Sequence, residues 1–268
     1  LMPLIEKHVP GTFCWIELGT TDQATAKHFY HTLFGWTHND ILMGPNHVYS
    51  IFQLEGRSVA AAYTLRHEQQ SKGVQPHWML YVAVDSADEA ASRAASLGGS
   101  ILTAPGDVPD AGRMAVLQDP AGAVFSVWQS RNHIGTEMNG VDGTLCWADL
   151  MTPDPVRAKE FYSALFGWKL AANEKESSGY LHIANGEKYI GGIPPAEHRD
   201  PNVPPHWLSY FAVSDCDKAA AAAIRNEAIA CSPPTTLENV GRMAVVTDTE
   251  GARFAIFQAL PHTPPSTH

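Results

Sequence analysis

Several kinds of segment are missing from this chain of 268 residues, and each absence narrows what it can do. Acidic residues outnumber lysine and arginine by 28 to 18, which gives a formal net charge of −10, and no basic run occurs. Because nucleic acids and anionic membranes select basic surfaces, we expect neither as a partner. No apolar stretch approaches the roughly 20 residues that cross a bilayer, and residues 1–11 lack the charged and apolar regions of a signal peptide. We therefore expect a cytoplasmic protein.

Cysteine is scarce as well. The four cysteines form no CxxC pair and follow no Cys/His zinc spacing: Cys14, Cys146, Cys216 and Cys231. Cys14 and Cys146 are copies of each other inside predicted strands; isolated buried cysteines behave as small apolar residues, and a reducing compartment keeps their thiols free. We therefore expect four free thiols, and neither a disulfide framework nor a zinc finger.

What the chain does contain is a duplication. Residues 12–36 and 144–168 agree at 14 of 25 positions when they are aligned without gaps. Two further motifs recur at matching distances, namely PHW at 76–78 and 205–207 and GRMAV at 112–116 and 241–245. Self-similarity at a fixed period indicates a repeated structural unit, here of about 130 residues.

The repeats predict the domain organisation. We expect one domain over residues 10–130 and a second over residues 144–259. Residues 131–143 show no hydrophobic periodicity and are predicted to link the two domains. The last segment, 260–268, is rich in proline and is predicted to be a disordered tail.

Each repeat begins with a strand followed by a helix. In the first strand Cys14, Ile16 and Leu18 alternate with Trp15 and Glu17, so we expect the two sets on opposite faces of a sheet. The next segment carries an apolar stripe at helical spacing, formed by Ala26, Phe29, Tyr30, Leu33 and Phe34. We expect this stripe to pack on the Cys14 face, which leaves Trp15 and Glu17 on the other face.

The boundaries of this helix are marked in both repeats. Asp22 and Asp154 are natural N-caps, and Gly35 and Gly167 stand where a left-handed C-cap is needed. Three short alternating strands and a polar loop at 66–75 follow, and the pattern then restarts with a strand, an alanine-rich helix and three more strands. Each repeat therefore contains two strand–helix–three-strand modules, which predicts an α+β fold.

Paired modules of this kind, with W-x-E/D-L-x-T-x-D, FY and LFGW segments and a later D-P-x-G-x-x-F, resemble the vicinal oxygen chelate superfamily. That superfamily includes glyoxalase I, bleomycin-resistance proteins, fosfomycin-resistance enzymes and extradiol dioxygenases. The resemblance covers about residues 12–130 and 144–259. It implies two tandem glyoxalase-like domains, each a curled, mostly antiparallel sheet with helices outside and a concave cleft for a small molecule.

The resemblance also identifies three positions per repeat where metal-using members carry their ligands. Here those positions hold Trp15, Met79 and Ser126 in the first repeat and Trp147, Leu208 and Ala255 in the second. None of these side chains is a normal ligand for a divalent metal, so we expect no metal cofactor. We expect these positions, together with Trp128, to line the clefts as ligand-binding residues.

An acidic residue and a histidine lie close to those positions in both repeats. Glu17 and His77 are expected on the cleft side of the first sheet, and Asp149 and His206 repeat them. A carboxylate beside a histidine raises the imidazole pKa and fixes its tautomer, which suits a general acid or base. We therefore predict these four as catalytic residues. Two alternatives stay open: a purely structural role, and a displaced divalent metal held by the pair and a third donor.

Two arginines complete the candidates. Arg113 and Arg242 occupy the same place in the two GRMAV strands, and a guanidinium in a cleft binds carboxylate or phosphate groups. We include both as ligand-binding residues, with pairing to a nearby surface acid as the alternative interpretation. Trp78 and Trp207 fall on the opposite, helix-packed side.

Two functions stay open at this point. The first is an enzyme of the lyase or isomerase type that acts on a small carbonyl or hydroxy compound through the acid and the histidine. The second is a metal-free binding module that sequesters or senses an apolar or aromatic molecule. Either way the expected partner is a small molecule, and the protein is expected to be a monomer or a homodimer.

Overall fold

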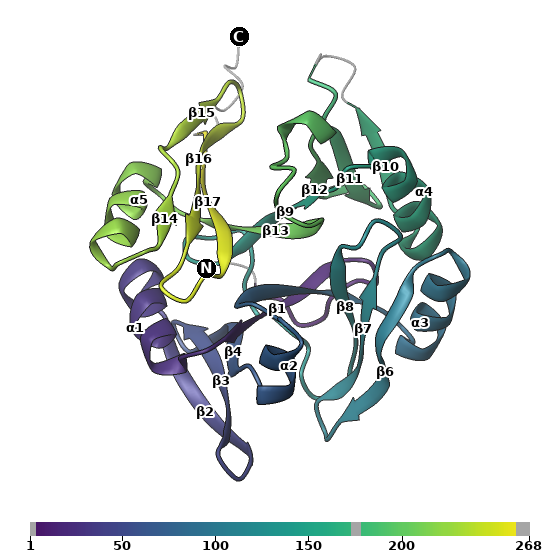
Figure 1. The fold of residues 1–268 in the computed structure, drawn as a ribbon, viewed down its shortest axis with the longest axis horizontal. Coiled ribbons are helices and arrows are strands. Elements are labelled where there is room, and N and C mark those ends of the chain that lie inside the picture. The colour runs from purple at the N-terminus through teal and green to yellow at the C-terminus, as the bar shows by residue number, and fades with distance from the viewer. Residues whose placement is uncertain (1–3, 173–177, 261–268) are drawn as a thin grey trace.

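The computed structural model describes residues 4–172 and 178–260, in which each repeat builds one sheet (Figure 1). The elements of the first repeat are β1 (Phe13–Thr20), α1 (Gln23–Phe34), β2 (Thr37–Gly44), β3 (His47–Leu54), β4 (Arg57–Thr64), α2 (His67–Ser71), β5 (His77–Ala83), α3 (Ala87–Ser96), β6 (Ser100–Val108), β7 (Gly112–Gln118) and β8 (Val124–Ser130). The elements of the second are β9 (Leu145–Met151), α4 (Pro155–Phe166), β10 (Lys169–Ala172), β11 (Leu181–Asn185), β12 (Lys188–Ile193), η1 (Ala196–His198), β13 (His206–Ala212), α5 (Cys216–Arg225), β14 (Ala230–Cys231), β15 (Thr235–Leu237), β16 (Gly241–Thr247) and β17 (Arg253–Ala259).

The two modules of a repeat pair with each other. In the first sheet the strand order is β2-β3-β4-β1-β5-β8-β7-β6, and the second sheet follows the same scheme from β10 to β16 and β14. The central strands β1 and β5 are antiparallel, whereas β1 with β4 and β5 with β8 are parallel. The sheets are mixed and curled (Figure 1), which confirms the predicted α+β architecture of two tandem units.

The predicted helix caps are present in both repeats. The Asp22 side chain accepts from two backbone N–H groups at the start of α1, and Asp154 accepts from one at the start of α4. Gly35 and Gly167 end these helices with φ values of 73° and 72°, a left-handed conformation that glycine adopts without steric cost. Local sequence signals therefore set the ends of the first helix of each repeat.

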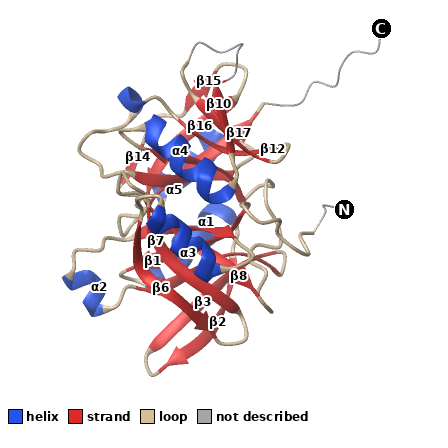
Figure 2. Cartoon of the chain, turned by 90° about the vertical axis from the view of Figure 1, so that its right-hand side faces the viewer, coloured by secondary structure: helices blue, strands red, loops and turns tan. Residues whose placement is uncertain are grey.

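The two sheets share one hydrophobic core. The helix-bearing faces pack toward each other, with α1 against α5 and α3 against α4 (Figures 1 and 2). Two buried tyrosines cross this interface: the Tyr30 hydroxyl donates to Asp248 at 2.7 Å, and the Tyr162 hydroxyl donates to Asp119 at 3.0 Å. The opposite, concave faces of the sheets consequently open toward opposite ends of the molecule.

Two local predictions are wrong. Cys14 lies on the Trp15 side of the sheet, because the pairing of β1 with β5 shifts register between Phe13 and Trp15 and breaks the alternation there. The polar loop predicted at 66–75 contains α2 (His67–Ser71), whose first turn is closed by a Gln69 side chain bonded to the Arg66 N–H.

The sequence predicts two segments outside the sheets, the linker at 131–143 and the tail at 260–268. Residues 131–143 form turns and bends, without helix or strand. Of the tail predicted at 260–268, all but the first residue lie outside the described residues. Across the described ranges, no helix is both long enough and apolar enough to cross a membrane.

Candidate functional site

Each concave face carries an apolar cluster of its own. The first concave face is built around Trp15, Tyr81 and Trp128, which are 3%, 3% and 6% exposed. The second concave face is built around Leu208 and Tyr210, with Trp147 packed at its side. Trp15, Trp128 and Trp147 therefore lie on the predicted face of their sheets, away from the helices, and their role as ligand-binding residues stays a prediction. Met79 belongs to the first cluster as well.

Glu17 is held in the first concave face by two tyrosines. Its Oε2 accepts from the Tyr49 hydroxyl at 2.7 Å, and its Oε1 accepts from the Tyr81 hydroxyl at 3.0 Å. The indole N–H of Trp15 donates in turn to the Tyr49 oxygen at 3.0 Å. Both carboxylate oxygens are thus oriented by hydroxyl groups that come from two different modules, on β3 and β5.

The second concave face repeats this arrangement around Asp149. Its Oδ1 accepts from Tyr180 at 2.5 Å and from the Trp147 indole at 3.1 Å, and its Oδ2 accepts from Tyr210 at 2.7 Å. We call Glu17 with Tyr49 and Tyr81, and Asp149 with Tyr180 and Tyr210, the two carboxylate–tyrosine centres. They differ in access, since Asp149 is 5% exposed whereas Glu17 keeps part of its surface accessible.

Burial controls the acidity of both centres. It raises the pKa of Glu17, and the hydrogen bonds from Tyr49 and Tyr81 work in the opposite direction. Burial likewise raises the pKa of Asp149 against the effect of its hydroxyl and indole donors. A carboxylate whose pKa lies above its usual range is a better proton acceptor than an ordinary surface acid.

The structure places His77 on the same face as Glu17 but does not pair them. His77 lies opposite Gly19, two residues along β1 from Glu17. Its Nδ1–H donates to the Gln75 carbonyl at 2.8 Å, which leaves Nε2 as the unprotonated nitrogen of the neutral ring. A backbone carbonyl therefore fixes the tautomer that we predicted a carboxylate would fix. Burial lowers the pKa of His77 and favours this neutral form.

His206 copies this feature in the second repeat. Its Nδ1–H donates to the Pro204 carbonyl at 2.8 Å, and burial lowers the pKa of the ring. Asp149 instead accepts hydrogen bonds from its two tyrosines and from the Trp147 indole. The histidine that lowers the pKa of Asp149 is His182 rather than His206. The acid and the histidine of each repeat thus share a face while each keeps other hydrogen-bond partners.

A third tyrosine joins the first concave face only. An added Cβ at Gly19 would lie 3.0 Å from the Tyr63 hydroxyl and 3.1 Å from the His77 ring, so glycine lets both approach the strand. The Tyr63 oxygen accepts from the Gln69 side chain at 3.3 Å, which leaves its own O–H to donate. In the second repeat Met151 stands opposite His206 in place of that glycine.

The residues at the expected metal positions do not form a ligand set. The first concave face offers an indole, a thioether and the buried Ser126 hydroxyl there, and within the described chain that hydroxyl has no hydrogen-bond partner. In the second face Leu208 and Ala255 are both buried in the apolar cluster. No group of three or more His, Cys, Asp or Glu side chains in residues 4–172 and 178–260 is arranged to hold a metal.

The linker covers part of the first concave face. The His133 ring packs edge-on against Trp15, with centroids 4.4 Å apart, and its backbone carbonyl accepts from the Trp128 indole at 2.8 Å. Further along, the Thr136 N–H donates to the Cys14 carbonyl at 2.7 Å. Trp15 is consequently buried, whereas Trp147 in the second face stays partly exposed.

Arg113 and Arg242 lie on the helix side, and the prediction that they point into the clefts is wrong. Arg113 alternates with Met114 along β7 and pairs with Asp88 of α3 at 2.7 Å. Arg242 pairs in the same way with Asp217 of α5 at 2.7 Å. The alternative interpretation, in which each arginine pairs with a nearby acid, is confirmed. Trp78 and Trp207 lie in the shared core, as predicted.

The tyrosines of the two centres were missed from the sequence. A signal existed for one pair, because Tyr81 and Tyr210 each follow the PHW histidine by four residues and so share its face of the strand. Tyr49 and Tyr180 lie in segments that have little else in common, VYSIF and GYLHI. Their role depends on how β3 and β11 curl over the sheet, which local sequence does not reveal.

Comparisons with known proteins agree with this architecture. The chain is 37% identical over 262 residues to "Putative glyoxylase CFP32" of Mycobacterium tuberculosis, covering 97% of this chain and 99% of that protein. It is 33% identical to "Anthracycline biosynthesis protein DnrV" of Streptomyces peucetius, covering 94% of each. Among solved structures, the Mn(II)-bound glyoxalase from Novosphingobium aromaticivorans matches with a TM-score of 0.63 at 15% identity, covering 97% of this chain and 85% of that one.

A second solved structure gives the same fold. The 2,3-dioxygenase LapB from Pseudomonas sp. KL28 matches with a TM-score of 0.63 at 12% identity, covering 96% of both chains. The model of one family matches twice, over residues 12–127 and over residues 144–256. The chain therefore belongs to the Glyoxalase/Bleomycin resistance protein/Dioxygenase superfamily.

Proposed function

We propose that this protein is an enzyme of the isomerase or lyase type that moves a proton on a small carbonyl or hydroxy compound in the first concave face. One observation carries the proposal: the carboxylate of Glu17, a part-buried residue, is oriented through both oxygens by tyrosine hydroxyls. A positioned carboxylate with a raised pKa suits general base catalysis near neutral pH. The glyoxylase name of one relative and the biosynthetic name of another both support a small organic substrate.

Three side chains divide the work. Glu17 takes a proton from the carbon next to a carbonyl and returns it to the same or the neighbouring carbon, so the reaction needs no oxidant or reductant. The Tyr63 O–H, on the same face beside Gly19, donates to the oxygen on which negative charge develops. His77 accepts a hydrogen bond from a substrate hydroxyl through Nε2, because its Nδ1–H is held by a backbone carbonyl.

The proposed chemistry assigns no step to a metal at the positions that family members use. The donors present there in the first repeat are Trp15, Met79 and Ser126, which do not suit a hard or borderline divalent ion. In this proposal the neutral Tyr63 hydroxyl takes over the polarisation of the substrate oxygen. We assign no displaced metal to the acid and the histidine, because Glu17 bonds to two tyrosines, His77 bonds to a backbone carbonyl, and no third His, Cys, Asp or Glu ligand joins them within the described residues.

The experiment measures exchange of the substrate C–H hydrogen for deuterium. This exchange reports proton abstraction directly, whichever product the enzyme forms. Hydroxyacetone and 2-hydroxyacetophenone are incubated with the protein in D₂O, and loss of the signal of the exchangeable C–H is followed by ¹H NMR. We expect protein-dependent exchange that Glu17→Gln lowers about 100-fold or more, in the range typical of a lost general base. His77→Gln is expected to raise KM more than it lowers kcat.

Asp149→Asn is the matched control, because Asp149 occupies the corresponding position of the other repeat and is 5% exposed. It should leave exchange within about twofold of the wild type, an effect far below that of losing a general base. Exchange that is equal in Glu17→Gln and the wild type contradicts the proposed role of Glu17. Absence of protein-dependent exchange on a panel of carbonyl compounds contradicts the proposed reaction class.

A second function is favoured by one feature of the other repeat. Trp147 is partly exposed on the second concave face, while the acid beside it is covered. We propose that this face binds an aromatic or apolar compound without converting it, since an exposed indole offers a flat apolar wall. A thermal-shift screen of aromatic acids and amphiphiles tests this, with a stabilisation expected in the wild type and lost in Trp147→Ala.

A further inference from the structure

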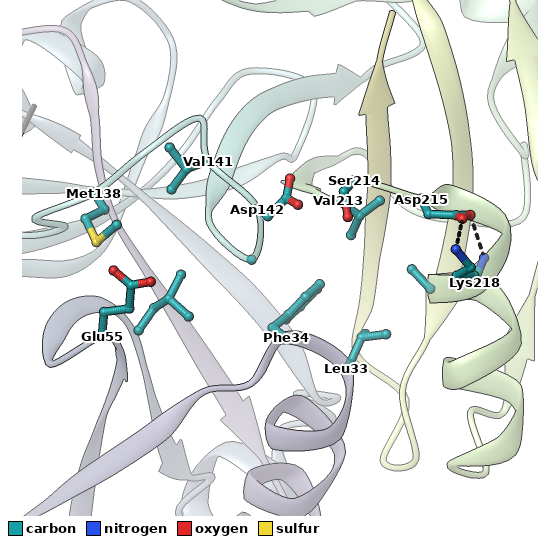
Figure 3. Close-up of a pocket in the computed structure, with 13 residues that line it drawn as sticks. Leu33, Phe34, Glu55, Met138, Val141, Asp142, Val213, Ser214, Asp215 and Lys218 are labelled. Atoms are coloured by element: carbon teal, nitrogen blue, oxygen red, sulfur yellow. Dashed lines mark hydrogen bonds and ion pairs between the residues drawn. The ribbon is translucent and has the colours of Figure 1, made fainter. Parts of the chain in front are cut away.

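A cavity of about 490 Å³ lies at the junction between the two repeats (Figure 3). Its walls come from the end of α1, the turn between β3 and β4, the linker and the start of α5. None of its lining residues belongs to the apolar cluster of either concave face. The volume falls within the roughly 300–1,000 Å³ that is usual for small-molecule sites, so the cavity is large enough to hold a ligand of its own.

The inner walls of this cavity are apolar. Phe34 lies at its centre between Met138 and Val141 of the linker on one side and Val213 on the other, as Figure 3 shows. Leu54, the last residue of β3, adds a further apolar wall. A ligand that fills this space must therefore present an apolar or aromatic body.

The mouth of the cavity is acidic. Glu55, Asp142 and Asp215 contribute three carboxylates, and Lys218 is the one cation among the lining residues. Lys218 is already paired with Asp215 at 2.9 Å. Neither Glu55 nor Asp142 has an ion-pair partner in the described part of the chain, so an excess charge of two carboxylates faces the opening. A cationic group on the ligand would neutralise this excess.

The other repeat shows how such a space is closed. Asn185 ends β11 as Leu54 ends β3, and its side-chain amide donates to the Pro10 carbonyl at 2.9 Å and to the Thr12 hydroxyl at 3.4 Å. These bonds draw the turn after β11 against the segment that precedes β1. Leu54 cannot form them, because its side chain carries no polar atom. The cavity at the first repeat is therefore tied to a specific sequence difference.

We propose that this cavity is a binding site for a small organic cation with an aromatic or apolar body, a lipophilic primary amine. The aromatic part packs on Phe34 and Leu54, and the ammonium group lies at the mouth between the carboxylates of Glu55 and Asp142. Packing beside Phe34 also suits a cation, since the face of an aromatic ring carries partial negative charge. The site is separate from the concave faces and does not depend on the reaction proposed for Glu17.

The test compares three probes of the same shape: 2-naphthylmethylamine, 2-naphthylmethanol and 2-naphthoic acid. Protein labelled with ¹³C in the methionine methyl groups reports on the cavity through Met138, whose signal is assigned with Met138→Leu. We expect the amine to shift the Met138 signal and to bind with a Kd about tenfold lower than the alcohol, which corresponds to about 1.4 kcal/mol, and the acid to bind more weakly than either. The preference for the amine should shrink as salt rises.

Two variants locate the interaction. In Glu55→Gln/Asp142→Asn the amine should bind no better than the alcohol to within about twofold, while Glu160→Gln/Glu238→Gln, which removes two exposed carboxylates elsewhere, keeps the preference. Leu54→Asn, which places the residue of the second repeat in the first, should abolish binding of both probes. Circular dichroism and Tm confirm that each variant is folded.

Three results would overturn the proposal. The first is equal affinity for amine and alcohol in the wild type. The second is an amine preference that survives loss of both Glu55 and Asp142 in a folded variant. The third is a shift of the Met79 or Met243 methyl signals while the Met138 signal stays in place, because those methionines belong to the concave faces. Failure of the hydrogen-exchange experiment leaves this site unaffected, so the two proposals fail separately.

Discussion

The two concave faces contain the same carboxylate–tyrosine centre, but the first exposes the acid and the second exposes the tryptophan beside it. In the first, the acid Glu17 is partly accessible while Trp15 is 3% exposed beneath His133. In the second, the acid Asp149 is 5% exposed while Trp147 is partly accessible. Duplication therefore preserved the hydrogen-bonded centre and changed which of its residues is the more exposed. This difference is why we place proton transfer in one face and aromatic binding in the other.

The largest expected effect tests this difference in access directly. Tyr210→Phe removes one hydroxyl donor from buried Asp149, and Tyr81→Phe removes the corresponding donor from Glu17. We expect the first to cost about 3 kcal/mol in unfolding free energy, because the carboxylate of a residue that is 5% exposed loses its partner, and the second about 1 kcal/mol, because Glu17 is the more exposed of the two residues. Urea denaturation of both variants measures the two values. Equal costs would show that the two acids are equally inaccessible.

The shared core offers a comparison in which the repeats should agree. Tyr30 donates to Asp248 and accepts from the Trp78 indole, and Tyr162 links Asp119 to Trp207 in the same way. Tyr30→Phe and Tyr162→Phe should each cost about 2 kcal/mol, since each leaves two buried polar groups without one partner.

Denaturation of these two variants, side by side, makes a matched pair. Costs that differ by more than about 1 kcal/mol would mean that the asymmetry of the concave faces extends into the core, because the two hydroxyls have equivalent partners. Phe29→Leu serves as a reference, because Phe29 is buried in the same core but forms no side-chain hydrogen bond. Its unfolding free energy shows how much stability is lost when a buried aromatic ring is replaced without breaking a hydrogen bond.

Much of the fold could be predicted because its signals are local. The helix caps at Asp22 and Gly35, the apolar stripe of α1 and the repeated LFGW segment each specify structure within a few residues. Duplication then showed which signals belong to the fold. The placement of Cys14 could not be obtained this way, because the bulge beside it depends on the register with β5. Neither could the direction of Arg113, which is decided by Asp88 on a helix 25 residues away in sequence.

The candidate site was predictable only in part. The faces of Trp15 and Glu17 followed from strand periodicity, and the non-ligating residues at the metal positions followed from the family resemblance. The partners of Glu17 did not, because Tyr49 and Tyr81 reach it from two other strands. His77 was placed on the correct face, but its hydrogen bond to the Gln75 carbonyl is a property of the chain entering β5. Contacts between modules are what the sequence alone leaves open.

Acid should act on the first repeat in part through the histidines beside its linker, while the lowered pKa of His77 contributes in the same direction. Burial lowers the pKa of His8 and of His133 from the ordinary value of 6.5, so below pH 6.5 the unfolded chain binds more protons than the folded one. The stability due to these neutral rings is fully present above pH 6.5 and is lost as pH falls toward their folded-state pKa values. We expect His8→Gln/His133→Gln to flatten the decline of unfolding free energy between pH 7.5 and 5.5.

Two neighbours must be considered in that experiment. The charge of Glu137 raises the pKa of His133, and the charge of His8 lowers it, so the two histidines are replaced together. His28→Gln, at an exposed position on α1, is the control and should keep the wild-type slope. A double variant with an unchanged slope would show that these two rings do not account for acid sensitivity, and that the linker docks independently of pH.

The smallest expected effect is a change in fluorescence quenching, and it concerns Trp15 and Trp147, the corresponding tryptophans of the two concave faces. Six of the seven tryptophans are at most 7% exposed, and Trp147 is the seventh. Acrylamide quenching of the intrinsic fluorescence should therefore arise mainly from Trp147 and fall in Trp147→Phe, while Trp15→Phe leaves it nearly unchanged. His133→Ala should raise quenching, because it removes a ring packed on Trp15. We expect the same variant to lose about 1 kcal/mol of unfolding free energy through the lost ring contact.

The double variant His133→Ala/Trp15→Phe then decides what the linker does on the first concave face. If His133 alone shields Trp15, the added quenching must disappear when Trp15 is replaced, because no other tryptophan packs as closely on that ring. If the quenching persists, the exposed indole is Trp128, whose N–H donates to the His133 carbonyl, and the whole linker has moved rather than one ring. The first result would leave the two faces distinguished by a single side chain. The second would make the backbone of residues 131–143 the element that separates a buried indole from an accessible one.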